Sequence, residues 1–211
     1  MADLTTIAEL GTAAGTLVLA VSTFAAVRSG NRSARIAEAT LLAGLRPLIV
    51  PTRREDPAQK IGFADNKWLT APGGGAAVEI ADDAIYLGIA LRNVGNGIAI
   101  LHGWDLYEFD GRPEDPRPQL ERFHRLTRDL YIAPGDIGFW QGVLRDPSSA
   151  EFDDARRAIE SGERSVVDVL YGDQQGLQRM VTRFTLTPHD DAWLATIARH
   201  WNVDGADPRQ R

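Results

Sequence analysis

The chain has 211 residues, of which 44% are hydrophobic and 25% are charged, and its formal net charge at pH 7 is −6. This composition excludes a fully disordered or collagen-like chain, and the acidic balance argues against a dedicated nucleic-acid-binding protein, which needs a basic surface. Because the chain has no cysteine, disulfide bonds, thiolate metal sites and a cysteine nucleophile are excluded as well.

The first predicted element is an apolar helix. The run from Leu10 to Val27 contains no charge and no proline, and as a helix it covers about 27 Å, close to the thickness of a bilayer core. We therefore predict a transmembrane helix within residues 1–27, the alternative being a helix buried in the core of an oligomer. A secretory signal peptide is disfavoured because residues 1–9 contain Asp3 and Glu9 but no basic residue.

Three arginines, Arg28, Arg32 and Arg35, follow the apolar run directly. By the positive-inside rule such residues stay in the cytoplasm. We therefore expect a single-pass protein of the cell membrane whose soluble domain faces the cytoplasm, with membrane lipid as one partner.

Small residues on the apolar helix predict self-association. Gly11 and Gly15 form a G-x-x-x-G pair, and Ser22 prolongs the run of small side chains. This pattern favours close packing between helices in a homo-oligomer. An anchor rich in alanine and glycine, without any role in association, is the alternative interpretation.

A stalk is predicted in residues 28–46, where helical spacing of apolar residues returns. This juxtamembrane helix either bends at Ser29-Gly30 or runs through them. It ends at Arg46-Pro47, because the residue before a proline avoids the helical conformation.

Residues 47–188 are predicted to form an antiparallel β-sandwich, since short strand-like runs alternate with glycine and proline turn signals. The candidate strands are Leu48–Pro51, Ala76–Ile80, Ile85–Val94, Ile98–Phe109, Ile137–Leu144, Val166–Tyr171 and Leu177–Thr187. One of these runs alternates clearly, with Leu87, Ile89 and Leu91 on one face and Gly88 and Ala90 on the other. The chain is thus expected to be mainly β.

The run YLGIALRNVGNGIAILHGWDLYEFDG, the later LYIAPGD and the segments VVDVLYGDQQG and RFTLTP are similar to bacterial immunoglobulin-like sandwich modules. The chain also resembles bacterial single-span membrane proteins of uncharacterised function, in which a stalk ending in arginine and proline precedes such a sandwich. The positions that carry the resemblance are Arg46, Pro47, Leu91, Asn93, Gly95, Gly97, Ala99, Pro134, Gly135, Tyr171, Asp173 and Gly176. It implies an immunoglobulin-like fold behind a membrane helix, and it brings no activity, cofactor or partner.

Asn93, Gly95 and Gly97 are predicted to form a structural turn between two core strands. An asparagine side chain bonds to neighbouring backbone groups, and glycine adopts positive φ angles readily. We therefore expect both glycines to have positive φ where the chain reverses. A cradle for a small ligand is the alternative, which a G-x-G pair alone does not support.

Two short helices are predicted beside the sandwich. The first follows the capping-box spacing from Ser148 to Glu151. The second lies in the C-terminal segment 189–211, where Trp193, Ile197 and Trp201 have the spacing of an amphipathic helix. This helix packs on the sandwich or places its tryptophans at a lipid interface.

The sequence carries no recognisable signature of a catalytic or metal site. No two of the four histidines have metal-ligand spacing, and the motifs of serine hydrolases and phosphate loops are absent. His102 is expected to be hydrogen-bonded inside the sandwich. We predict no cofactor, no metal ion and no catalytic residue, with an enzyme of unrecognised site as an alternative.

The segment 112–128 is the one surface feature that indicates a partner. It contains five arginines: Arg112, Arg117, Arg122, Arg125 and Arg128. They are candidates for contact with anionic lipid headgroups or with an acidic protein. A solvated loop with internal ion pairs is the alternative.

These patterns together predict a membrane-anchored β-sandwich that serves as an interaction or scaffold module, without catalytic activity. It would bind lipid and an unidentified protein partner, and no nucleic acid. The alternatives are a soluble homo-oligomer or filament-forming protein with a packed N-terminal helix, and an enzyme.

Overall fold

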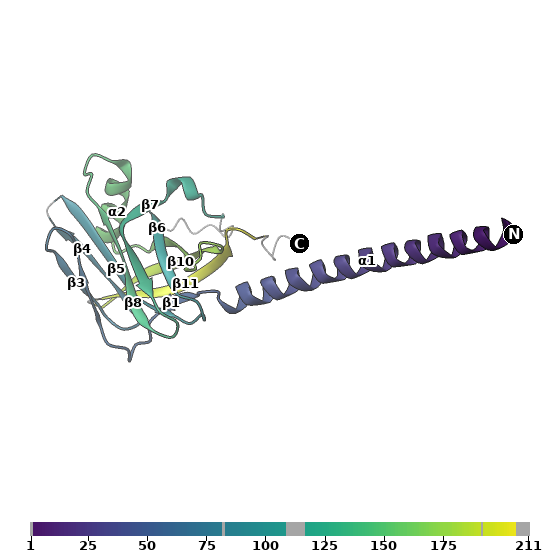
Figure 1. The fold of residues 1–211 in the computed structure, drawn as a ribbon. Helices are drawn as coiled ribbons and strands as arrows, with labels where there is room; N and C mark the ends of the chain where they lie inside the picture. The colour runs from purple at the N-terminus through teal and green to yellow at the C-terminus, as the bar shows by residue number, and fades with distance from the viewer. Residues whose placement is uncertain (1, 82, 109–116, 191, 206–211) are drawn as a thin grey trace. The chain divides into compact units, whose positions relative to one another are not determined.

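The computed structural model describes residues 2–81, 83–108, 117–190 and 192–205, and in the N-terminal helix it describes the side chains of Glu9, Gly11 and Ala14 onward. The chain divides into two compact units, residues 1–44 and 45–211. The first unit is the helix α1 (Ala2–Gly44), and the second is built mainly of strands (Figure 1).

α1 is one continuous helix of 43 residues. It passes through Ser29-Gly30 without a break, so the uninterrupted form of the predicted stalk is correct. Its large apolar side chains are exposed, Leu19 to 69% and Phe24 to 68%. Among the described residues, no helix combines the length and the apolar character needed to cross a membrane. The side chains of Leu10, Thr12 and Ala13, within the predicted span, lie outside the described set.

The second unit consists, in its described part, of antiparallel strands with one α-helix and one short 3-10 helix. The strands are β1 (Ile49–Pro51), β2 (Gln59–Gly62), β3 (Trp68–Ala71), β4 (Gly75–Ala81), β5 (Ala84–Asn93), β6 (Ala99–Glu108), β7 (His124–Ile132), β8 (Ile137–Leu144), β9 (Ser165–Gly172), β10 (Arg179–His189) and β11 (Ala192–Asn202). The helices are η1 (Leu120–Arg122) and α2 (Ala150–Glu160). The prediction of a mainly β chain is confirmed.

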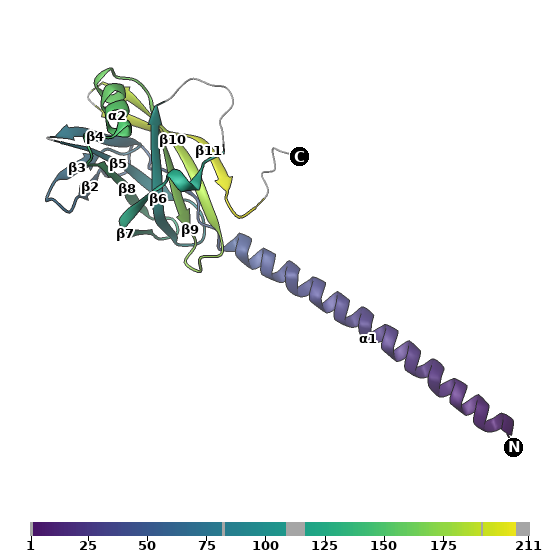
Figure 2. The same cartoon turned by 90° about the horizontal axis from the view of Figure 1, so that it is seen from above.

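The described strands other than β2 and β3 form one curled sheet in the order β1-β5-β4-β11-β10-β9-β6-β7, with β8 paired to β5 (Figure 2). β8 takes one edge of β5, while β4 and β1 pair with successive stretches along the other edge. The sheet folds over so that β5 faces β6, β9 and β10 across the main hydrophobic core. The immunoglobulin-like form of this sheet stays a prediction.

β5 is covered on both faces, which explains why almost all of its residues are buried. Leu87 and Leu91 point into the main core, whereas Tyr86 and Ala90 pack under the β2–β3 hairpin, so the alternation read in the sequence is confirmed. Gly88 lies on the hairpin face. A Cβ atom there would overlap the Cδ1 atom of Ile61, so the glycine allows the hairpin to approach the sheet.

The predicted C-terminal helix is wrong, because residues 192–202 form strand β11. The chain turns back after β10 at Asp190, which has a φ of 51°, and β11 pairs with β10 along its whole length. The spacing of Trp193, Ile197 and Trp201 also consists of even steps, which a strand allows as well as a helix, although an extra residue between Ile197 and Arg199 places Trp193 and Trp201 on opposite faces of β11. Pairing with β10 decides between them.

α2 begins as a helix where the sequence predicts one, but with a different cap. Ser149 rather than Ser148 is the N-cap, and its hydroxyl accepts a hydrogen bond of 3.2 Å from the Phe152 N–H. The Ser148 hydroxyl donates instead to Asp146, and Glu151 contacts His124 rather than returning to the cap. Phe152 and other apolar residues of α2 close one part of the main core.

Candidate functional site

The candidate site lies on the outer face of the sheet, where a β-bulge in β6 brings two polar residues out of the core. The register of β6 shifts between Leu101 and Gly103 against both neighbouring strands. Leu101 points into the core before the bulge and Trp104 does so after it. This change of phase leaves Asp105 on the outer face. His102, predicted to be buried, lies in the bulge and is exposed.

A second bulge, between β10 and β11, acts in the same way. Phe184 pairs with Ile197, whereas the preceding Arg183 pairs with Arg199, so one residue of β11 is extra. Trp193 contacts the main core, and beyond the bulge Arg199 and Trp201 lie on the outer face beside Arg183. The two bulges therefore deliver charged and aromatic side chains to one surface.

These positions form a charged ladder, which we define as Asp105, Asp168, Arg183 and Arg199. Asp105 pairs in register with Asp168, Asp168 with Arg183, and Arg183 with Arg199, so the ladder crosses β6, β9, β10 and β11. At its centre Arg183 donates to both carboxylate oxygens of Asp168, from Nε at 2.7 Å and from Nη2 at 2.6 Å. Bidentate pairing of this kind holds both side chains in one geometry.

Two aromatic rings enclose the centre of the ladder. The guanidinium carbon of Arg183 lies 4.6 Å from the ring centre of Trp201 and 5.1 Å from that of Tyr107. The Tyr107 hydroxyl also lies 3.5 Å from Asp168. As a result the side chains of Arg183 and Asp168 are only 5% and 1% exposed. The rings remove water from the ion pair and stabilise the cation through their π faces.

Burial dominates the electrostatics of the ladder. It raises the pKa of Asp168, and the neighbouring charge of Asp105 adds to the rise. Hydrogen bonds from Arg183 stabilise the ionised carboxylate and oppose this shift. Burial likewise raises the pKa of Asp105, against the opposing charge of Arg122 at 3.5 Å, and it raises the pKa of Tyr107. Asp105 is thus a buried acid, and the side chain of its ion-pair partner, Arg122, is about half exposed.

A cavity of about 220 Å³ opens beside the ladder, between α2 and the ends of β6 and β9. Its lining is Leu106, Tyr107, Arg122, Glu151, Asp154, Ala155, Ala158 and Ser165. The charged lining residues already have partners within the chain: Arg122 lies beside Asp105, Glu151 accepts from His124 at 2.8 Å, and Asp154 accepts from Arg157 at 2.6 Å. The contact of Glu151 with His124 links α2 to β7 beside the cavity.

A metal centre has no support in the described residues, which contain no group of three or more side chains able to hold an ion. The ladder combines two carboxylates with two guanidinium groups, and guanidinium groups are not metal ligands. What the site provides chemically is a fixed, paired set of charges, partly shielded from water.

Four of the five arginines of segment 112–128 lie in the part of the chain that the structure describes, and they make different contacts. Arg112 lies outside the described residues. Arg122 contacts Asp105, and Arg128 donates to the Gly62 carbonyl at 3.1 Å and to Gln141 at 2.9 Å. Arg125 is exposed on β7. Arg122 is thus held in an ion pair and Arg128 in hydrogen bonds to neutral groups, and contact of the segment with lipid or an acidic protein stays a prediction.

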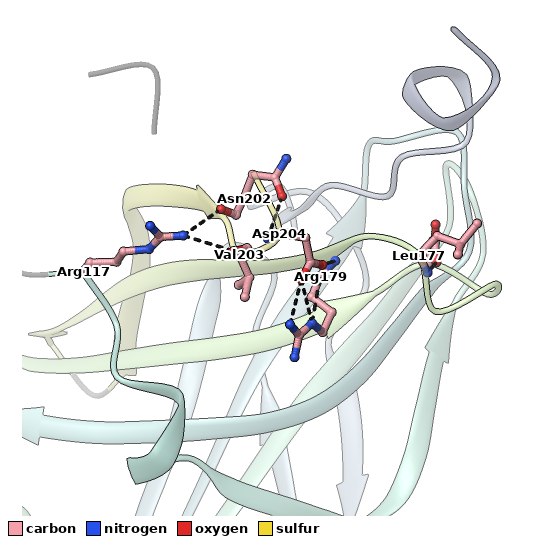
Figure 3. A network of polar contacts seen from close by, with 7 residues as sticks. Arg117, Leu177, Arg179, Asn202, Val203 and Asp204 are labelled. Carbon is pink, nitrogen blue, oxygen red and sulfur yellow. Dashed lines mark hydrogen bonds and ion pairs between the residues drawn. The ribbon is translucent and has the colours of Figure 1, made fainter. Parts of the chain in front are cut away.

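Arg117 contacts the chain at the end of β11. It donates to the carbonyls of Asn202 at 3.3 Å and Val203 at 3.1 Å, as Figure 3 shows. Nearby, Arg179 makes a bidentate pair with Asp204, with one contact of 2.7 Å (Figure 3). These two arginines fix the C-terminal end of the described sheet.

Asn93 is fully buried and uses its side chain as a link between loops. Its Oδ1 accepts from the backbone N–H groups of Leu48 and Gly95, and its Nδ2 donates to the carbonyls of Gly97 and Ile132. The four distances range from 2.6 to 3.1 Å. This side-chain amide therefore accepts two and donates two hydrogen bonds, all of them with backbone groups.

The predicted positive φ angles of Gly95 and Gly97 are wrong, since the glycines with positive φ in the described residues are Gly74, Gly135, Gly162 and Gly176. The two glycines are required for another reason. A Cβ atom at Gly97 would overlap the Leu45 carbonyl oxygen, and one at Gly95 would overlap that of Arg46. They provide space for the first residues of the second unit, residues 45–211, which we call the β-domain.

Gly11, Gly15 and Ser22 are exposed on α1. A Cβ atom at either glycine would have nothing within 4 Å, so the helix backbone is accessible there. The structure holds one chain, and the predicted association through these residues stays a prediction.

Sequence reasoning missed the charged ladder, although a signal is present. Asp168 stands alone in the apolar run VVDVLY, and Arg183 stands among apolar and threonine residues in MVTRFTL. A single charge inside such a strand indicates either an exposed face or a buried pair, and only the register of β9 against β10 shows which.

No family model matches the chain, and no curated protein matches it. Among solved structures, it is similar to a protein from Archaeoglobus fulgidus with 12% identity and a TM-score of 0.26, covering 62% of this chain and 95% of that one. It is also similar to a β-glucosidase from Kluyveromyces marxianus with 11% identity and a TM-score of 0.24, covering 60% of this chain and 14% of that one. At these scores neither structure bears on what this chain does.

Proposed function

We propose that the chain is an interaction module held at a membrane by its N-terminal helix, with the β-domain as the part that recognises a partner. The observation that carries this proposal is the exposure of large apolar side chains on α1 between Leu17 and Val27. Apolar side chains that have no cover in their own chain mark a surface for lipid or for another protein.

The direction of these side chains favours lipid. Leu17, Val18 and Leu19 are consecutive and all exposed, so they point in three directions about 100° apart around the helix axis. A helix that is apolar on every side is typical of a lipid or core environment, whereas a two-helix seam covers one stripe. The basic residues Arg28 and Arg32 come next and support a cytoplasmic β-domain.

The charged side chains of the ladder and of the adjacent cavity are paired within the β-domain, so we assign recognition to other parts of its surface. Asp168 and Arg183 neutralise each other, and Arg122 and Glu151 have partners of their own. Groups arranged in this way stabilise a surface. An immunoglobulin-like sandwich, as the sequence resemblance implies, fits the same role.

A soluble homo-oligomer with α1 packed in its centre is the second candidate function. Two observations favour it: no membrane-crossing helix is found in the described residues, and Gly11 and Gly15 leave the helix backbone open to close contact. In such an assembly the apolar side chains of neighbouring copies would replace lipid.

The two candidates are distinguished by single lysine substitutions at Leu17, Val18 and Leu19. A lysine at the centre of a membrane helix costs about 3 kcal/mol whichever way it points along the helix surface. We therefore expect each of the three variants to lose much of its retention in carbonate-washed membranes. Ile36→Lys, at a position in the stalk that is 57% exposed, is the matched control and should be retained like the wild type.

The opposite result identifies the oligomer. If the wild-type chain leaves the membranes in carbonate and sediments as an assembly, and only one of the three lysine variants dissociates it, α1 packs through a single seam. That outcome rejects the membrane proposal.

A further inference from the structure

In the described part of the chain, one edge of β4 is paired with another strand only at its beginning. β4 pairs with β5 along Ala76–Ala81, but on its other side it pairs with β11 only at Gly75 and Ala76. Trp193 faces Ala76, so Ala192, the first residue of β11, would stand opposite Ala77. Beyond that point the β10–β11 turn directs the chain back, and within the described residues no strand is hydrogen-bonded to Val78–Ala81 on this side of β4.

A groove runs along this edge. It has a volume of about 440 Å³ and lies among β3, β4 and the start of β11. Figures 1 and 2 both show β3 and β4 side by side at one side of the β-domain. Trp68, Val78 and Trp193 contribute apolar walls, and Thr70 is an exposed polar member. Trp68 is 65% exposed, which is unusual for the largest apolar side chain.

An open strand edge has a defined chemistry. It presents main-chain N–H and C=O groups in a row, and an extended peptide satisfies them by joining the sheet as a further strand. Apolar side chains at alternate positions of such a peptide would enter the adjacent groove. Main-chain hydrogen bonds then supply general affinity, and the groove supplies selectivity.

We propose that the edge of β4 binds an extended, alternately apolar peptide segment of a partner protein, antiparallel to β4 and in line with β11. One apolar side chain of the segment lies between Trp68 and Trp193. The inference names the partner of the proposed interaction module and rests on that function for its biological sense, while its physical basis is the strand edge alone.

Charge indicates what stands opposite the middle of the edge, and it disfavours a second copy. Glu79 is the central residue of the stretch from Ala77 to Ala81 and pairs with Lys67 at 2.5 Å. Two copies joined by a two-fold axis at the centre of this stretch would place Glu79 opposite Glu79, and like charges directly opposite destabilise a strand pair. A partner segment with a lysine or threonine at this position avoids the repulsion.

The test uses the full chain in detergent micelles and a short capped peptide in which valine and threonine alternate around one central lysine. Titration calorimetry should show saturable binding, and hydrogen exchange at residues 77–81 should slow. The same peptide with N-methyl groups on alternate backbone nitrogens lacks the donors for strand pairing and should not bind.

Substitutions then locate the site. Trp68→Ala removes one wall of the groove and should weaken binding about tenfold, as loss of an aromatic contact at an interface typically does. Thr70→Lys fills the groove from an exposed position and should weaken binding similarly without loss of folding. Tyr131→Ala, at an aromatic residue with a similar exposure of 62% outside the groove lining, is the matched control and should bind like the wild type.

Three results would overturn the proposal: no saturable binding of the peptide, undiminished binding of its N-methylated form, or undiminished binding to Thr70→Lys. Self-association of the wild-type chain that Trp68→Ala abolishes would assign the edge to a second copy and also reject it. Peptide binding by a chain that washes off membranes would leave this inference standing while the membrane proposal fails.

Discussion

Asp168 and Arg183 face each other across β9 and β10, joined by two hydrogen bonds of 2.7 and 2.6 Å, and their side chains are 1% and 5% exposed. Removing two charges from water costs free energy that their attraction only partly returns. The ion pair as a whole therefore contributes little to the free energy of folding, but the loss of one partner leaves the other buried and is costly.

Asp168→Asn should lower the free energy of unfolding by about 3–5 kcal/mol, because it leaves the buried Arg183 guanidinium without its hydrogen-bonded carboxylate. Urea denaturation followed by far-UV circular dichroism measures the change. Asp154→Asn, which breaks an exposed pair with Arg157, is the matched control and should change stability little.

The double variant Asp168→Leu with Arg183→Met tests the cause. Since it removes both charges, it should be more stable than Asp168→Asn. A double variant less stable than the single one would show that the ion pair is itself strongly stabilising, contrary to the argument from desolvation.

Several of the strands that the sequence predicts correctly are buried and rich in apolar residues. β5 is buried between the main core and the β2–β3 hairpin, and β9 and β10 carry long apolar runs, so their composition reflects burial. β7 was not predicted, because its sequence HRLTRDLYI is mostly polar and half of it faces solvent at the end of the sheet order. Its pairing with β6 makes it a strand.

The bulges mark the limit of reasoning from periodicity. The step from Leu101 to Trp104 contains one residue too many for simple alternation, so a strict two-residue period would have placed Asp105 in the core. The charged ladder depends on this shift and on the register of strands distant in sequence. Neither is encoded in any local pattern, whereas the turn residues Asn93, Gly95 and Gly97 were recognisable from their types.

Asp105→Asn should raise stability near neutral pH. Burial raises the pKa of Asp105, so between the unfolded value of 3.8 and the raised value the folded state holds more protons than the unfolded state. Stability then falls as pH rises through that window. The asparagine removes this dependence together with the buried charge. Denaturation curves between about pH 4 and 8 measure it.

Asp168→Asn, at the position paired with Asp105, should have the opposite effect. It should lower stability at the same pH values, because Arg183 loses its hydrogen-bonded carboxylate. Two identical substitutions at paired positions thus have opposite signs. Equal destabilisation by both would show that Arg122 pairs with Asp105 more strongly than its 58% exposed side chain suggests.

Asn93→Ala should destabilise the β-domain by about 3 kcal/mol or more, because it removes four hydrogen bonds and leaves buried backbone groups without partners. Thermal denaturation measures the loss. Asn96→Ala, three residues away with an exposed side chain, should change the melting temperature little. A loss for Asn93→Ala as small as that for Asn96→Ala would mean that water replaces the amide of Asn93.

Asp65 makes the stability of the chain depend on pH in the acid range. The hydroxyl of Tyr86 and the guanidinium of Arg145 donate to its carboxylate and lower its pKa to about 2. Because the folded value lies below the unfolded value of 3.8, the contribution of Asp65 is complete above that value and is lost as pH falls toward 2. Asp65→Asn should therefore flatten the fall of stability in this range.

Tyr86→Phe removes the largest cause of the shift in the pKa of Asp65 and should move the titration of this carboxyl group to higher pH, as NMR would detect. A titration unchanged by Tyr86→Phe would contradict the assignment of that hydroxyl as the main donor.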